Sequence, residues 1–266
     1  MSKANRTRQQ ARARIAEMRA AEARRKRRRN WLTGIGAAVV LIAAAVGIGL
    51  AVAGRGGGSG SGPGTADGGK PQLKLASLST LGTLKPASGA VTAGPEGGVP
   101  IPTAQPLASA ATAATGQSVD AIRCQSSEQT IFHIHAHLTI FVNGSPRQIP
   151  AAIGITGAQA QNTPQGSFIS AGTCFYWLHT HAADGIIHIE SPVQRTFTLG
   201  DFFDLWGQPL GPDRAGPAIG PVVAIYNGQR YEANPRDIPL NAHAQIQLEV
   251  GKPLIAPVKI TFPNGL

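Results

Sequence analysis

The sequence predicts a mostly β (α+β) fold: one β-sandwich or partly closed barrel with one short helix, preceded by a transmembrane helix. Three observations predict this. Short strand-like runs separated by turn residues follow one another from about residue 119 to the end of the chain. Within them, only residues 198–207 have the pattern of a helix. An uncharged run as long as a membrane-spanning helix, residues 31–54, follows an arginine-rich N-terminus.

Residues 1–30 form a basic tail with twelve Lys/Arg and two acidic residues, a difference that equals the net charge of the whole chain, +10. Residues 31–266 therefore carry no net charge, and the composition gives no reason to expect nucleic-acid binding. We expect the tail to stay cytoplasmic as a topology signal. Its helix-forming composition also allows contact with anionic lipid.

Residues 31–53 are expected to cross the lipid bilayer as a single-pass helix, because an uncharged helix of this length spans a hydrocarbon core of roughly 30 Å. The N-terminus would then be cytoplasmic and the C-terminal domain extracytoplasmic at the cell membrane. The alternative is a cleaved signal peptide, since Ala51-Val52-Ala53 fits a cleavage site.

Residues 54–116 are rich in Gly, Pro, Ser and Ala, which is typical of a linker. Leucines within residues 73–89 also favour packing of this part on the domain as an arm. The extracytoplasmic domain is predicted to span residues 117–266, which is long enough for one hydrophobic core.

The strand predicted over residues 130–142, TIFHIHAHLTIFV, alternates with period two. One face is apolar and should lie on the core: Phe132, Ile134, Ala136, Leu138, Ile140 and Val142. The other face carries His133, His135 and His137. A solvent-facing row would more usually carry Thr, Lys, Glu or Ser, so three imidazoles there indicate a chemical role.

A second window, residues 177–192, predicts a hairpin around Asp184-Gly185. A two-residue turn pairs His181 with His188, whereas a four-residue loop over 182–185 pairs His179 with His188. Both registers place His179, His181, His188 and Glu190 on one face.

Six of the seven histidines lie in these two windows, which favours metal binding over a structural or pH-sensing cluster. The predicted ligands are His133, His135, His137, His179, His181, His188 and Glu190. One ion can bind only one or two of the first three, because alternate residues of a strand are about 6.7 Å apart. Glu190 either binds the ion or orients an imidazole. His243 is isolated and is expected to have no such role.

Imidazole with at most one carboxylate suits Zn²⁺ or Cu²⁺, and Ni²⁺ and Fe²⁺ stay open. Neutral imidazole is the ligand form, so metal affinity should fall as the pH drops through about 6.5. The sequence therefore predicts a membrane-anchored extracytoplasmic metal-binding protein. The alternatives are a metalloenzyme with an open metal position and a cell-surface interaction domain with a structural metal or none.

Cys124 and Cys174 both lie in the predicted external domain, where an even pair indicates a disulfide. The alternative is that their thiolates bind metal. Strand parity argues against that role for Cys174, which would face away from His179 and His181.

The helix predicted at 198–207 has Thr198 as its N-cap and Gly207 as its end. The chain contains no H-E-x-x-H, G-x-S-x-G, Walker or dinucleotide motif, which removes those enzyme classes. The span 130–207, with HIHAHL, VNG and LHTHAADGIIHIESP, resembles an exported bacterial domain family. This resemblance implies export and supplies no function.

Overall fold

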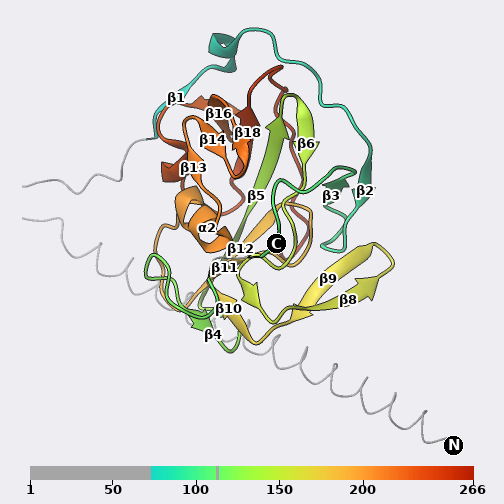
Figure 1. The fold of residues 1–266 in the computed structure, drawn as a ribbon, viewed down its shortest axis with the longest axis vertical. Helices are drawn as coiled ribbons and strands as arrows, with labels where there is room; N and C mark the ends of the chain where they lie inside the picture. The colour runs from blue at the N-terminus through green and yellow to red at the C-terminus, as the bar shows by residue number, and fades with distance from the viewer. Residues whose placement is uncertain (1–72, 112–113) are drawn as a thin grey trace, which may run out of the picture. The chain divides into compact units, whose positions relative to one another are not determined.

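The computed structural model describes residues 73–111 and 114–266, which belong to one compact unit (Figure 1). The basic tail, the predicted membrane helix at 31–53 and the first part of the predicted linker lie outside the described residues. Within the described ranges, no helix combines the length and hydropathy that a membrane span requires.

An eight-stranded sheet forms the centre of the described unit, and β5 lies in its middle between β18 and β12 (Figure 1). Its strands, in spatial order, are β1 (Leu75–Ala76), β17 (Gln229–Tyr231), β16 (Val222–Tyr226), β18 (Gln245–Val250), β5 (Phe132–Val142), β12 (Ile186–Ser191) and β11 (Leu178–His179), with β6 (Ser145–Arg147) also paired to β5. Only the β18–β5 pair is parallel. The predicted mostly-β fold is confirmed, and the sheet does not close into a barrel.

Short strands and turns surround this sheet. Two further sheets consist of β4 (Cys124–Gln125), β10 (Cys174–Tyr176) and β7 (Ile155–Thr156), and of β13 (Leu210–Gly211), β14 (Arg214–Ala215) and β15 (Ala218–Ile219). Two hairpins are formed by β2 (Val91–Ala93) with β3 (Pro100–Pro102) and by β8 (Gln159–Thr163) with β9 (Gly166–Ala171). The 3-10 helices are η1 (Leu78–Leu81) and η2 (Pro235–Asp237).

The predicted helix is confirmed as α2 (Leu199–Trp206). The Thr198 side chain accepts from the Asp201 backbone N–H, and the Asp201 side chain accepts from the Thr198 N–H, which completes a capping box. Gly207 ends the helix in the left-handed conformation. Phe202, Phe203 and Trp206 are fully buried, so burial of this apolar face fixes the helix on the core.

The predicted parity of β5 is also confirmed. Ala136, Leu138 and Ile140 are buried in the main core, and each contributes to its stability through apolar area removed from water. The histidines of β5 therefore lie on the opposite face of the sheet.

Residues 73–111 belong to the folded unit, so this unit begins well before residue 117. The segment is held by backbone hydrogen bonds, in which Lys85 N–H donates to Leu254 and Leu107 N–H donates to Gln148. Backbone hydrogen bonds depend little on side-chain type. The Gly/Pro-rich composition of this segment therefore could not show that these hydrogen bonds form.

The C-terminal segment covers the histidine face of the sheet through two glutamine side chains of β18. The Gln245 amide bonds to the backbone N–H and carbonyl of Ile260, and the Gln247 amide bonds to Ile255 and Val258. Each amide thus pairs with backbone as a neighbouring strand would.

Cys124 and Cys174 form a disulfide between β4 and β10, with Cα atoms 5.5 Å apart. The disulfide prediction is confirmed, and the alternative of thiolate metal ligands is wrong. Since β10 leads directly into β11, the bridge supports the strand that carries His179.

Replacing both cysteines by serine is expected to lower the free energy of unfolding by about 3 kcal/mol, because the bridge closes a long loop in the unfolded chain. Urea unfolding of the double variant, of oxidised wild type and of reduced wild type measures this difference in free energy. Equal midpoints for oxidised and reduced wild type would contradict the expectation.

Candidate metal centre

Three adjacent strands align the histidines across the sheet. β12 pairs with β5 so that His188 lies opposite His135 and Glu190 lies opposite His133. β11 pairs with β12 so that His179 lies opposite His188. This is the register of the four-residue loop over 182–185.

The loop register follows from Asp184. Its Oδ1 accepts from the Ile186 N–H at 3.1 Å, and its backbone carbonyl accepts from His137 Nε2 at 2.9 Å. The first bond joins the loop to the start of β12, and the second ties the loop to β5.

His179, His181 and His188 form a compact set that we call the inner triad. One ring nitrogen of each lies within 4.8 Å of the other two. The Nε2 atoms of His179 and His181 are 3.1 Å apart, close to the roughly 3.3 Å between two nitrogens bound to one tetrahedral Zn²⁺. All three side chains are buried.

The remote nitrogen of each inner-triad ring is fixed by a hydrogen bond. His179 Nδ1–H donates to the Tyr176 carbonyl at 2.8 Å, and His181 Nδ1–H donates to the Ile169 carbonyl at 2.6 Å. His188 Nε2 donates to Glu96 Oε1 at 2.7 Å. Such partners orient metal-binding histidines and fix their tautomers.

This tautomer assignment leaves lone pairs on Nε2 of His179 and His181, and the two lone pairs face each other. Neutral rings in that arrangement repel one another, whereas a cation between them would accept both lone pairs. The inner triad therefore has the chemistry of a transition-metal site.

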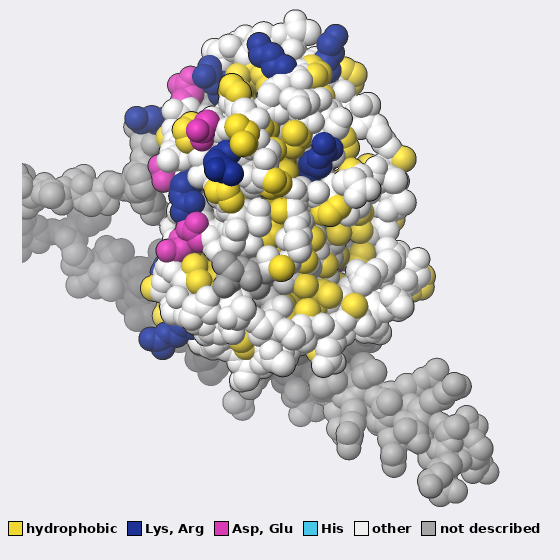
Figure 2. Space-filling view, in the orientation of Figure 1, with side chains coloured by type: hydrophobic (Ala, Val, Ile, Leu, Met, Phe, Trp, Pro, Cys, Tyr) yellow, Lys and Arg dark blue, Asp and Glu magenta, His cyan; other side chains and the backbone are white. Residues whose placement is uncertain are grey.

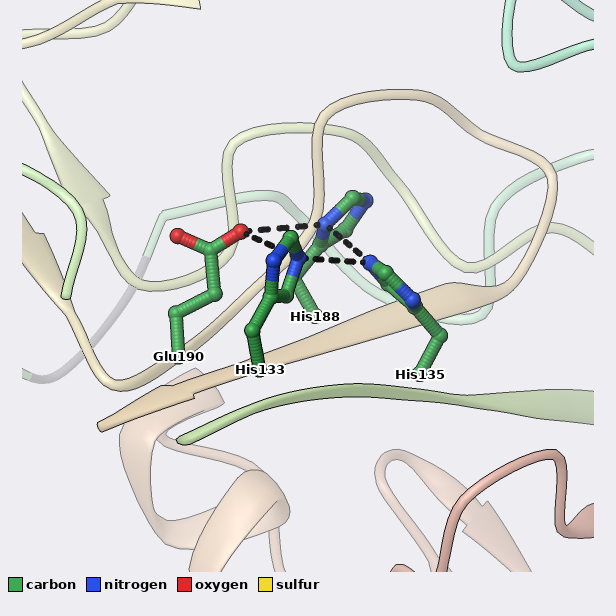
Figure 3. Close-up of side chains that lie close together, drawn as sticks. All are labelled: His133, His135, His188 and Glu190. Atoms are coloured by element: carbon green, nitrogen blue, oxygen red, sulfur yellow. Dashed lines mark hydrogen bonds and ion pairs between the residues drawn. The ribbon is translucent and has the colours of Figure 1, made fainter. Parts of the chain in front are cut away.

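His133, His135 and Glu190 form a second set, which we call the outer group (Figure 3). His133 Nε2 lies 3.0 Å from both His135 Nε2 and Glu190 Oε1. His135 Nε2 also lies 3.1 Å from His188 Nδ1, which joins the outer group to the inner triad.

His137 is not brought together with the other predicted ligands. It is buried, its Nε2 donates to the Asp184 carbonyl, and burial lowers its pKa to about 4. Its role in this structure is to hold the loop between β11 and β12. His243 is exposed, and its ring stacks on Phe262 and bonds to the Leu266 carbonyl. Its backbone N–H donates to the His135 carbonyl, but its side chain belongs to neither set of potential ligands.

Glu96 and Glu128 are site residues that the sequence did not indicate. Glu96, from the β2–β3 connection, is 7% exposed and reaches His188. Glu128 Oε1 lies 3.4 Å from His181 Nε2 and is more exposed. Neither belongs to a histidine window, and Glu96 lies in the Gly/Pro-rich stretch predicted as linker.

Electrostatics favour the neutral form of two of these histidines. Burial, followed by the neighbouring His188, lowers the pKa of His135 to about 3 and holds the pKa of His179 well below its usual range. The pKa of His188 shifts in the opposite direction. Burial lowers its pKa, but hydrogen bonds to Glu190 and Glu96 outweigh this and raise it to about 9.

A cavity of about 320 Å³ adjoins the site and is lined by the outer group, by His181 and His188 of the inner triad, and by β9. The Phe168 ring stacks on His181, with centroids 4.9 Å apart. The face shown in Figure 2 presents hydrophobic, basic and acidic side chains, and no histidine is visible on it.

The chain matches no known protein family, curated protein or solved structure. The resemblance to an exported bacterial domain family therefore stays a prediction.

Proposed function

We propose that this protein binds a divalent transition metal, Zn²⁺ or Cu²⁺, through the inner triad His179, His181 and His188. The observation that carries the proposal is the pair of facing Nε2 atoms, 3.1 Å apart, in rings whose Nδ1 atoms are each hydrogen-bonded to a backbone carbonyl. Packing alone gives no reason to direct two buried nitrogen acceptors at each other.

The charge balance of the site supports the same proposal. Glu96 and Glu190 are both buried, and their ion-pair partners within the described residues are histidines. Protonated His188 can balance only one of these two carboxylates. A divalent cation at the inner triad, which displaces that proton, would balance both.

We further propose that the domain works outside the cytoplasm, tethered to the cell membrane by residues 31–53. The disulfide supports an oxidising compartment, and the charge pattern of residues 1–54 supports the tether. In this setting the domain would capture, hold or deliver the ion.

A metalloenzyme is the second candidate, and the cavity beside the ligands favours it. Three protein ligands leave a coordination position free for a water or a substrate. Turnover of any substrate that stops on metal removal would select this candidate over metal storage.

Calorimetric titration of Zn²⁺ and Cu²⁺ into the full-length protein tests the proposal, with the His243→Ala variant as matched control. We expect both proteins to bind at micromolar ion concentration with equal affinity. No uptake of either ion by wild type would refute the proposal.

Metal affinity is expected to rise with pH up to about 9, not to level off above 6.5. Because the pKa of His188 is raised to about 9, the metal-free protein carries a proton on Nδ1 at neutral pH, and an ion must displace it. Between pH 6 and 8 the affinity should increase about tenfold per pH unit, with one proton released. Titrations in buffers of different ionisation enthalpy measure both quantities, and a flat pH profile would contradict this assignment.

A further inference from the structure

We infer that the outer group, His133, His135 and Glu190, holds a second divalent transition ion beside the first. This inference rests on the proposed function of the inner triad. It turns a single metal site into a two-ion centre.

His188 belongs to both groups of potential ligands. Its Nε2 is bonded to Glu96, so Nδ1, which lies 3.1 Å from His135 Nε2 and 3.6 Å from Glu190 Oε1, is the nitrogen left to bind an ion. A neutral imidazole nitrogen offers one lone pair. His188 can therefore bind one ion. The inner triad has the stronger claim, because all of its remote nitrogens have fixed partners.

With His188 assigned to the inner triad, the outer group supplies the ligand atoms for a second ion. His133 Nε2, His135 Nε2 and Glu190 Oε1 are three ligand atoms, and the two neighbouring distances among them are both 3.0 Å (Figure 3). Two imidazoles and one carboxylate are a common ligand set for Zn²⁺, Cu²⁺ or Fe²⁺.

Glu190 belongs to two groups of potential ligands, one with His133, His135 and His188 and one with His179 and Glu128, and the ligand atoms of each group lie within 4.8 Å of one another. Its Oε2 is buried and has no hydrogen-bond partner among the described residues. A carboxylate with one oxygen on each ion would satisfy both oxygens, as in two-metal sites with ions about 3.5–4 Å apart.

The two ions should differ in lability. The inner-triad side chains are buried, whereas the His133 side chain is 36% exposed at the cavity. His133 and His135 also lack the fixed remote partners of the inner triad within the described residues. The outer ion should bind more weakly and exchange faster.

Metal content of the full-length protein at saturating micromolar Zn²⁺ tests the inference, with His133→Ala as the variant and His243→Ala as control. We expect two ions per chain in wild type and His243→Ala, and one in His133→Ala. His133 is half-exposed, so this change should not unfold the domain.

Electron paramagnetic resonance of the Cu²⁺-loaded protein provides a second readout. Two Cu²⁺ ions a few ångströms apart should show magnetic coupling in wild type, and His133→Ala should give the uncoupled signal of one ion. One ion per chain in wild type, or two uncoupled ions, would overturn the inference and leave the inner site intact. No bound ion at all would instead refute the proposed function.

Discussion

Replacing His181 by alanine is expected to lower Zn²⁺ affinity at least about a hundredfold. His181 Nε2 faces His179 Nε2 at 3.1 Å, and its Nδ1 is fixed by the Ile169 carbonyl, so the ring is placed before any ion arrives. Its loss removes a direct ligand, which should cost more than the roughly 10–100-fold that loss of an outer partner costs. Calorimetric titration at pH 7.5 measures the change.

Two further variants serve as comparisons for the affinity of His181→Ala. His243→Ala makes the same chemical change at an exposed histidine that belongs to neither ligand set, keeps the backbone bond to His135, and should bind as wild type does. Glu96→Gln keeps an acceptor for His188 but removes the charge, and it should lower affinity about tenfold. If His181→Ala binds as tightly as His243→Ala, the inner triad is not the metal site.

Replacing Gly154 by alanine is expected to lower the free energy of unfolding by more than about 4 kcal/mol and to weaken metal binding. Gly154 has a φ of +70°, which disfavours any side chain. A Cβ there would also lie 2.2 Å from the Leu178 carbonyl oxygen and 3.2 Å from the Cβ of His179. Relief of this contact requires β11 to move, and His179 moves with it.

Gly82 provides the matched control, because it also has a positive φ, +77°, but a Cβ there would meet nothing within 4 Å. Gly82→Ala should cost roughly 1–3 kcal/mol from backbone strain alone and leave metal affinity unchanged. Urea unfolding and Zn²⁺ titration of both variants separate strain from displacement of β11. Wild-type metal affinity in a folded Gly154→Ala variant would show that Gly154 does not position His179.

The sequence predicted those parts of the site that depend on strand periodicity. His133 and His135 share a face on β5, as do His188 and Glu190 on β12, because alternation along a strand is a local property. The choice between the two hairpin registers does not follow from alternation along one strand. It depends on hydrogen bonds that Asp184 makes to Ile186 and, through its carbonyl, to His137.

Strand alternation alone does not predict the face on which Trp177 lies. Uninterrupted alternation from Cys174 would place Trp177 on the histidine face, but the strand breaks between β10 and β11. The Trp177 side chain instead lies in the main core, with its ring against Phe197. A break of this kind depends on the partners of each strand, which the sequence does not display.

Glu96 has a practical consequence for anyone who isolates this domain. Composition suggests cutting the chain near residue 117, and such a fragment would keep every predicted ligand. It would nevertheless lack β1, β2 and β3 and the carboxylate that fixes His188. A shortened protein that begins at residue 117 would therefore be a poor reagent for measuring metal affinity, and one that begins before residue 73 retains the complete site.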